Sequence, residues 1–510
     1  MSGEALYLLE DTWKAGEAPK GKQTGFTSLN PPGSYHRFRI RAKEAPPRRK
    51  QPRPFNPRVS KIGLADSLLR EVIKLGFKLR RKEHRQMLLS RPCIYGTFSG
   101  HFGGFHPIKD RCTGCMRCVQ ENPGMCHVER NPEFFKFADS YWIPVDPSKA
   151  SYSPVSTVAY EASTGKIPIK GMGYKGSFAG PGWDSIWTDM SEIVRPTRDG
   201  VYGREYISTL VDLGSKPKFL DVTNQVRPSA FRTVEIPLPI IFDHLPSNLN
   251  DQSILQSIAL ASDQVGTFFI ATPEQSGDLL CNHGRDLIPL VSPSDVVRNL
   301  DGIRGAPAVE LLEYDSNAVQ QIREVDQTLP ISIRLPLSKK AGHTATVLAM
   351  DGVDVIHLCA NYHGKGDGED SLFVKDLIRS VHDALVKETL RDNVTLIVSG
   401  GITLAEHVPK AIACGADLIA LDTTILVALQ AEFLDECKSS ETGRIKQEKF
   451  DFHWGQQRLV NLLASWHDQL IEVLSAMGMR DVRRLRGDVG RIMFDEDLER
   501  EAFADIDKRT

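Results

Sequence analysis

Four cysteines lie close together in the stretch RCTGCMRCVQENPGMC, and their spacing is suited to holding a metal centre. Cys112, Cys115 and Cys118 follow the pattern C-x2-C-x2-C, and Cys126 comes after seven more residues. Three thiolates on such short turns are typical of ferredoxin clusters. Zinc sites more often use two separated C-x2-C pairs or a mixture of Cys and His. We therefore predict a [4Fe–4S] cluster, with zinc as the alternative; Cys126 is the expected fourth ligand and Cys93 the reserve.

Two glycine- and hydroxyl-rich turns in the C-terminal half have the composition of a phosphate site. Glycine lets the backbone approach an anion closely, and N–H groups at a helix start, together with hydroxyls, donate hydrogen bonds without a cation. The sequence SGGITLAEHVPKAIACGADLIALDTT supplies both turns. The candidate donors are Ser399, Gly400 and Gly401 in the first turn and Asp422, Thr423 and Thr424 in the second. Each turn follows an apolar run, so we predict phosphate binding at the ends of two strands.

Eight short apolar runs separated by helical stretches would position these turns. Near-continuous apolar character is typical of parallel strands buried on both faces. The runs cover residues 238–243, 266–271, 286–291, 307–312, 331–336, 353–359, 394–400 and 417–422. Eight alternations favour a closed α/β barrel, a (β/α)8 TIM barrel, over an open doubly wound sheet. The phosphate turns then follow strands seven and eight, where such barrels commonly bind phosphate.

The rest of the chain divides by composition. We predict a basic Pro-rich arm and helix (1–91), a ferredoxin-like iron–sulfur segment (92–149), a Gly- and aromatic-rich connector (150–235), the barrel (236–436) and a C-terminal helical extension (437–510). The arm, with Arg37 to Arg58 as its most basic part, either packs along its own protein or docks onto an acidic partner subunit. Membrane-surface and nucleic-acid binding are weaker alternatives.

Composition limits the class of protein. The chain has 510 residues, 41% of them hydrophobic, and a formal net charge of -2, which argues against a dedicated nucleic-acid binder. No run of about 18 apolar residues offers a membrane span, and the N-terminus lacks the features of a signal peptide. Nine cysteines in this arrangement suit a reducing compartment. We expect a cytoplasmic protein.

At this point the chain resembles a known family. The segments LIVSGGITLAEHVPKAIACGADLIALDTTILVAL and QQRLVNLLASWHDQLIEVLSAMGMRDVRRLRGD look like the flavin-binding barrel of glutamate synthases and its C-terminal helix. The connector WDSIW, followed by VEIPLPIIFD, looks like the family's entry into its first strand. The resemblance covers roughly residues 180–490. It implies that FMN is the phosphate-bearing ligand and that its phosphate lies on Gly400 and Gly401.

The resemblance weakens where the substrate would lie. The family's Gly-Gly-Thr-Gly signature after strand six is replaced by NYHGKGDGEDS, and the first-strand loop reads FDHLPSNLND. The family's lysine near the flavin corresponds to Arg334, whose forked cation would stabilise a reduced flavin; a buried structural ion pair is the alternative. His363 and Lys365 in the altered loop are candidate proton donors, as is His357, although a histidine at a strand end is more often structural.

The family's cysteine cluster after the last strand is reduced to Cys437, and no nucleophilic cysteine follows Met1. We therefore expect any glutaminase activity in a separate subunit. No strand is followed by a G-x-G-x-x-G turn, so electrons should come from a redox partner protein, ferredoxin-like or NAD(P)H-oxidising.

The leading hypothesis is an FMN-dependent oxidoreductase that passes electrons between its cluster and FMN and acts on an imine or 2-oxo acid-derived small molecule. The alternatives are an electron-transfer or structural subunit of a redox complex, and a flavin-free barrel with a zinc knuckle.

Overall fold

The computed structural model describes most of residues 232–494 and shorter stretches between residues 10 and 215. The predicted amphipathic helix within residues 67–89 lies outside the described residues, as does most of the Gly-rich part of the connector. Contact density divides the chain into two compact units. One comprises residues 1–46, 158–167 and 179–510, and the other comprises residues 47–157 and 168–178.

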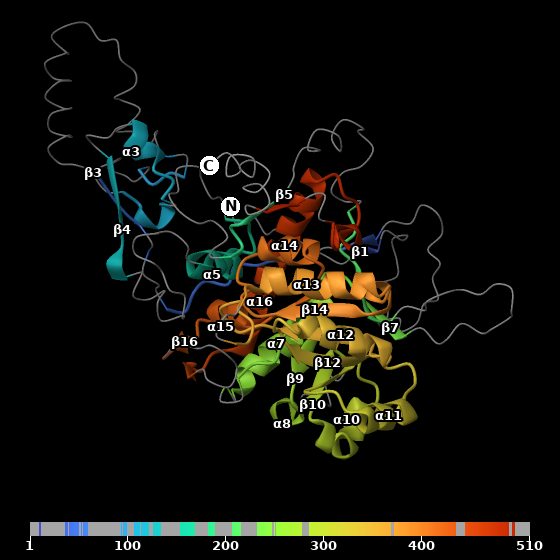
Figure 1. Cartoon of the computed structure of the whole chain (residues 1–510). Helices are drawn as coiled ribbons and strands as arrows, with labels where there is room; N and C mark the ends of the chain where they lie inside the picture. Colours follow the sequence, from blue (N-terminus) through green and yellow to red (C-terminus); the bar gives the residue numbers. More distant parts are fainter. Residues whose placement is uncertain are drawn as a thin grey trace, which may run out of the picture. The chain divides into compact units, whose positions relative to one another are not determined.

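The larger unit contains a closed eight-stranded barrel, which confirms the predicted fold (Figure 1). Every neighbouring pair of its strands is parallel, and β15 pairs with β8 to close the ring. The strands are β8 (Ile240–Phe242), β9 (Phe269–Ala271), β10 (Leu287–Val291), β11 (Val309–Leu311), β12 (Ile331–Pro336), β13 (Val355–Cys359), β14 (Thr395–Ser399) and β15 (Leu418–Leu421). Each lies inside one of the eight predicted apolar runs.

Helices connect successive strands and cover the barrel (Figure 1). They are α7 (Gln252–Val265), α8 (Pro273–Ser276), α10 (Leu300–Ile303), α11 (Ser316–Val325), α12 (Ala341–Met350), α13 (Val374–Lys387), α14 (His407–Ala413) and α15 (Thr423–Ala428). Local signals explain several boundaries. Asp251 and Asp315 accept backbone N–H bonds as N-caps of α7 and α11, and Gly266 ends α7 in the left-handed conformation.

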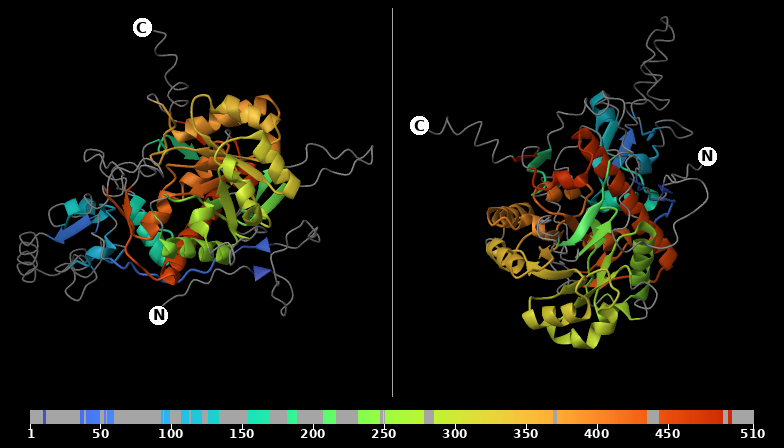
Figure 2. Two further views of the ribbon diagram at one scale, coloured as in Figure 1. Left: turned by 90° about the horizontal axis from the view of Figure 1, so that it is seen from below. Right: turned by 90° about the vertical axis from the view of Figure 1, so that its right-hand side faces the viewer.

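The predicted long C-terminal helix is α16 (Phe452–Ala476), which packs along α7 (Figure 2). Its Arg458 is fully buried and donates to the carbonyls of Ala428 and Ala45. Asn461 donates to the Lys43 carbonyl and accepts from the Lys43 N–H. Residues 40–46, inside the predicted basic arm, are therefore held by their own chain, as the first of the two readings of the arm expects.

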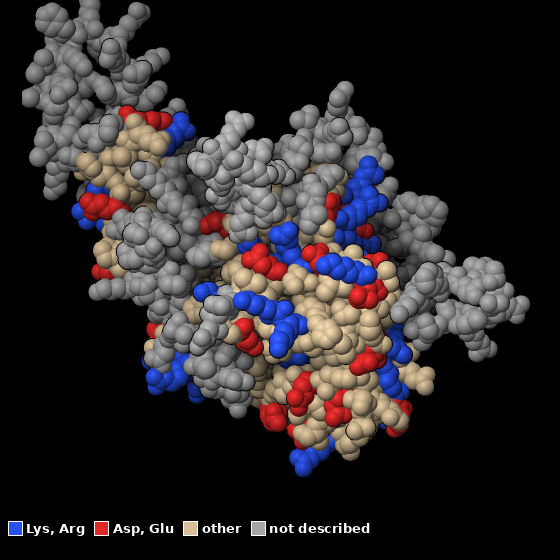
Figure 3. All heavy atoms as spheres, in the orientation of Figure 1, with Lys and Arg blue, Asp and Glu red and all other residues tan. Residues whose placement is uncertain are grey.

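The same unit contains helix α5 (Pro154–Thr164) from residue 158 onward and four short pairings outside the barrel, the first between β1 (Glu10–Asp11) and β2 (His36–Arg37). Strand β6 (Val211–Ser215) pairs with β7 (Arg232–Ile236), β5 (Ile186–Thr188) with β18 (Ile492–Phe494), and β16 (Glu432–Phe433) with β17 (Ile445–Lys446). Figure 3 shows Lys and Arg interspersed with Asp and Glu on the face of the molecule that it presents.

The smaller unit holds the cysteine segment. Strand β3 (Phe55–Val59) pairs antiparallel with β4 (Cys126–Arg130). The short α3 (Arg117–Glu121) contains Cys118 and precedes β4 in the sequence. The last part of the predicted arm thus forms a strand of this unit. No described helix is long and apolar enough to cross a membrane.

Candidate functional site

Four charged side chains meet at one end of the barrel. Arg334 on β12 forms a forked pair with Asp243, at 2.9 and 3.1 Å, and donates to Glu310 on β11 at 2.8 Å. Glu310 in turn binds His357 Nδ1 on β13, at 3.0 Å. The strand register places Arg334 beside His357 on adjacent strands. The cluster of Asp243, Glu310, Arg334 and His357, called here the buried charge cluster, is therefore fixed by four different strands.

The charges in this cluster compensate one another. Burial alone would raise the pKa values of Asp243 and Glu310, but Arg334 and His357 hold both below their usual range. Burial would lower the pKa of His357, but the neighbouring Cys359 and Glu310 raise it well above its usual value. The cluster therefore contains two cations and two carboxylates at neutral pH.

The structure thus places Arg334 in the buried ion pair that the sequence left as the alternative to a flavin contact; its side chain keeps 15% exposure. The ligand atoms of Asp243, Glu310 and His357 lie within 4.8 Å of one another, which is close enough to hold a metal ion. The Arg334 guanidinium already bonds both carboxylates of this group. It supplies positive charge there, so the arrangement needs no metal.

The turn after β14 has the opposite character, because it leaves hydrogen-bond donors without acceptors. Gly400 and Gly401 adopt φ angles of +92° and +72°. Among the described residues, the buried N–H groups of Gly400, Gly401 and Ile402 find no hydrogen-bond acceptor, whereas the next two N–H groups bind His407 Nδ1. Consecutive buried N–H groups without acceptors are rare in folded proteins unless a ligand satisfies them. This turn can therefore bind an anion, as predicted for Gly400 and Gly401.

Ser399, which ends β14, connects the turn to the buried charge cluster. Its hydroxyl lies 3.1 Å from His357 Nε2. Ser399 is buried, so its hydroxyl contacts His357 inside the barrel and does not face solvent.

Two other segments cover the glycine turn. Trp183, from the connector, donates its indole N–H to the Gly401 carbonyl at 2.9 Å and stacks on His407. The loop after β13 lies against the same turn: a Cβ added to Gly401 would come within 2.3 Å of Gly364 Cα. His363 and Lys365 belong to this loop, where both backbone N–H groups donate to Asn361 Oδ1. The structure therefore brings both predicted proton donors to the glycine turn, His363 half-buried and Lys365 exposed.

The turn after β15 lies beside the glycine turn, because the Thr424 hydroxyl donates to the Ile402 carbonyl at 2.9 Å. Its donors are only partly available. The N–H and the hydroxyl of Thr423 both donate to Asp422 Oδ1, at 2.5 and 2.9 Å. No described side chain forms an ion pair with Asp422, and burial together with the charge of Asp243 raises the pKa of Asp422 to about 7.

The cysteine segment brings five thiols into one neighbourhood. Cys118 and Cys126 are buried with Phe98, and Cys93 packs against them. The thiols of Cys118 and Cys126 are hydrogen-bonded to each other. Gly114 and Met116 adopt positive φ angles between the cysteines and turn the chain there.

The five cysteines differ in whether they line a small cavity of about 10 Å³. Cys93, Cys112, Cys115 and Cys118 line it, and Cys126 does not. A tetrahedral zinc ion would hold its sulfurs about 3.8 Å apart. In the described part of the chain, no three cysteine sulfurs lie within 4.8 Å of one another.

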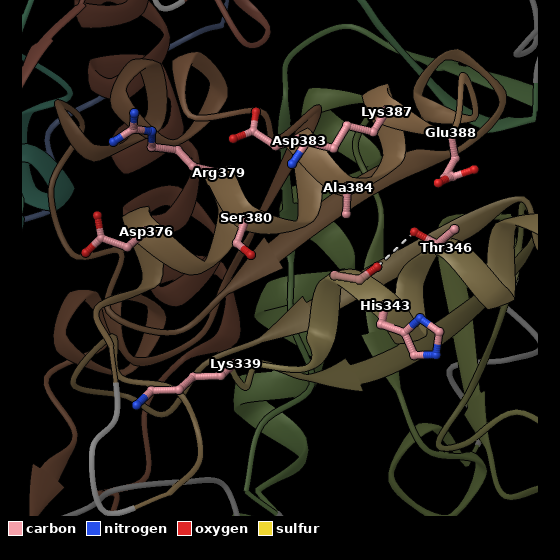
Figure 4. Close-up of a pocket in the computed structure, with 11 residues that line it drawn as sticks. Lys339, His343, Thr346, Asp376, Arg379, Ser380, Asp383, Ala384, Lys387 and Glu388 are labelled. Carbon is pink, nitrogen blue, oxygen red and sulfur yellow. Dashed lines mark hydrogen bonds between the residues drawn. The ribbon is translucent and has the colours of Figure 1, made fainter.

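A larger hollow lies elsewhere, on the outside of the barrel between α12 and α13 (Figure 4). It measures about 620 Å³ and carries both signs of charge, including Lys339 and Lys387 as well as Asp376 and Asp383. None of the residues predicted from the sequence to bind or react lines it.

The sequence did not indicate that Asp243 and Glu310 belong to the buried charge cluster, or that Trp183 covers the glycine turn. One signal was available: Glu310 is a lone acid inside the apolar run PAVELL, and a buried acid needs a cationic partner.

Comparison with known proteins confirms the resemblance stated from the sequence. Residues 310–480 match the conserved region in glutamate synthase. An archaeal-type glutamate synthase [NADPH] of Dehalococcoides mccartyi is 22% identical, covering 74% of this chain and 85% of the relative. An archaeal glutamate synthase [NADPH] of Archaeoglobus fulgidus is 21% identical, with the same two coverages. Among solved structures, a mandelate oxidase variant with a monooxide FMN adduct aligns with a TM-score of 0.37 at 16% identity, covering 55% of this chain and 87% of that one.

Proposed function

We propose that this chain, a distant relative of the glutamate synthases, is an iron–sulfur flavoprotein oxidoreductase with FMN at the barrel and a [4Fe–4S] cluster in the cysteine unit. The observation that carries the flavin part is the row of buried N–H groups without acceptors at Gly400, Gly401 and Ile402. These groups lie inside the region that matches glutamate synthase. They would hold the phosphate, and the Thr424 hydroxyl fixes the neighbouring turn against them.

When bound, FMN would exchange one or two electrons, whereas the cluster would carry one at a time. The protein's own contribution is a shielded barrel end, where Arg334 remains the proposed cation beside the flavin. His363 and Lys365, at the edge of the glycine turn, remain the proposed proton donors toward an imine or 2-oxo acid-derived substrate. A redox partner protein would supply the electrons, and a separate glutaminase subunit would supply ammonia if the substrate requires it.

The alternative function is an electron-transfer or structural subunit with an altered substrate site. The compensation within the buried charge cluster favours it, because Arg334 already serves two carboxylates there. The two functions differ in whether flavin bound to this chain turns over substrate.

The test is anaerobic purification followed by quantification of flavin, iron and acid-labile sulfide. We expect FMN together with iron and sulfide. Protein that contains zinc without sulfide would overturn the cluster, and protein that neither carries nor takes up flavin would overturn the cofactor assignment. Flavin that is reduced by a chemical reductant but is not reoxidised by any imine or 2-oxo acid would favour the alternative function.

The cluster ligands can be assigned separately. Cys112, Cys115 and Cys118 are the proposed core set, and the fourth ligand is Cys126 or Cys93. The cavity favours Cys93, because Cys93 lines it and Cys126 does not. Cys93→Ser and Cys126→Ser should therefore differ: the first should lose iron, and the second should keep most of it. Cys414→Ser, a buried thiol of the barrel, is the control and should leave the iron content unchanged.

A further inference from the structure

The two neighbouring turns at the phosphate end have opposite electrostatic needs. In the described part of the chain, the N–H groups of Gly400, Gly401 and Ile402 in the turn after β14 have no acceptor, so this turn favours an anion. The turn after β15 already contains an anion-forming group, because Asp422 accepts both the N–H and the hydroxyl of Thr423. The Thr424 hydroxyl joins the two turns through the Ile402 carbonyl, and both turns are buried, so a carboxylate on one and a phosphate on the other would repel each other.

The surroundings of Asp422 do not relieve this repulsion. The charged group that acts on it is Asp243, at the end of the adjacent strand β8, where the Asp243 N–H donates to the Leu421 carbonyl. Asp243 has its own cation in Arg334, whereas no described cation pairs with Asp422. Among the described residues, the donors that bind the Asp422 carboxylate directly are the N–H and hydroxyl of Thr423 and the backbone N–H of Asp422 itself.

We propose that Asp422 is an internal competitor of the cofactor phosphate: as a carboxylate it opposes the phosphate at the glycine turn, and as a neutral acid it admits it. The inference rests on the proposed binding of FMN and adds a control on that binding. The neutral acid can donate its O–H to a phosphate oxygen, so protonation replaces a repulsive contact with an attractive one.

The expected pH dependence follows from the direction of the pKa shift. Asp422 titrates near pH 7, so it is mostly neutral at about pH 6 and mostly ionised at about pH 8. FMN should therefore bind more tightly at about pH 6 than at about pH 8, by about tenfold. The phosphate itself gains charge over the same range, because its second pKa is about 6. A control that lacks only the Asp422 charge is needed to separate the two effects.

Asp422→Asn is that control, since it keeps the shape and removes the charge. Binding of FMN and of riboflavin to the apo-protein would be followed by flavin fluorescence at both pH values. We expect Asp422→Asn to bind FMN about tenfold more tightly than the wild type at about pH 8 and similarly at about pH 6. Riboflavin, which lacks the phosphate, should bind both proteins equally. Asp392→Asn removes the same charge at a side chain that is 86% exposed, and should bind FMN as the wild type does.

The outcomes separate this inference from the proposed function. If the wild type and Asp422→Asn bind FMN with equal affinity at about pH 8, the competitor role is wrong and the flavin assignment stands. An equal gain for riboflavin would also overturn it, because the effect would then not act on the phosphate. If neither protein binds FMN at either pH, both the inference and the flavin assignment fall.

Discussion

Two clusters of polar groups lie at the same end of the barrel. They differ in whether their buried charges and hydrogen-bonding groups have partners. In the buried charge cluster, Arg334 and His357 face Asp243 and Glu310, so each charge has a partner. At the glycine turn and the turn after β15, three N–H groups have no acceptor among the described residues, and no described cation pairs with Asp422. Completed hydrogen bonding indicates a structural role, whereas incomplete hydrogen bonding indicates a missing ligand. The predictions below test this distinction.

The largest effect should come from breaking the compensated cluster. Arg334→Met leaves Asp243 and Glu310 without their shared guanidinium, and we expect the free energy of unfolding to fall by about 3–5 kcal/mol. Urea unfolding of the apo-protein would measure it. Arg298→Met is the control, because its pair with Asp295 is exposed and spans 3.6 Å; it should change stability by less than about 1 kcal/mol. Equal effects of the two variants would show that the cluster does not stabilise the barrel.

The glycine turn should be sensitive to a single methyl group. Gly401→Ala places a Cβ 2.3 Å from Gly364 Cα at a φ of +72°, whereas Gly305→Ala adds one into open space at a φ of +86°. Both variants bear a backbone cost of about 1–2 kcal/mol, and Gly401→Ala should lose about 2 kcal/mol more through the clash. Thermal unfolding of the pair measures the difference. Similar losses in both would mean that the loop after β13 does not press on this turn.

Asp422 should reduce the stability of the apo-protein as the pH rises. The pKa of Asp422 is raised in the folded state, so its contribution to stability is full below the unfolded value of 3.8 and is lost as the pH rises through about 7. Asp422→Asn should therefore be more stable than the wild type at about pH 8, by about 4 kcal/mol, and close to it at about pH 4. Melting temperatures at the two pH values give the comparison, and a difference independent of pH would contradict it.

The smallest effect concerns the cover of the glycine turn. Trp183→Phe removes the donor to the Gly401 carbonyl and keeps an aromatic ring against His407. We expect a loss of about 1 kcal/mol, the usual contribution of one hydrogen bond, in urea unfolding. A loss several times larger would indicate that the indole also supports the barrel core.

The barrel could be predicted from the sequence, because parallel strands buried on both faces consist of near-continuous apolar runs. The predicted run 331–336 is the observed strand β12, and 394–400 differs from β14 by one residue at each end. The position of the glycine turn was also predictable, since Gly400 and Gly401 directly follow a strand, and anion binding there stays a prediction.

Long-range pairing could not be predicted in the same way. Arg334 and Asp243 are 91 residues apart, and Trp183 and Gly401 are 218 apart. Nothing local to either residue identifies its partner. The raised pKa of Asp422 depends on its burial and on the charge of Asp243, and no short segment of the sequence shows either. The position of Asp422 after strand eight was predictable, and this environment was not.

The hydrogen bonds between α16 and residues 40–46 can form only after the C-terminal helix has been synthesised. Lys43 and its partner Asn461 are 418 residues apart. At typical translation speeds, roughly 20–80 s pass between the ribosome's release of the first segment and that of the second. During that interval Ile40, Ala42 and Ala45, all buried in the finished protein, lack α16 beside them. The nascent chain thus carries an exposed apolar segment beside a basic one, a combination that chaperones can bind until the last helix emerges.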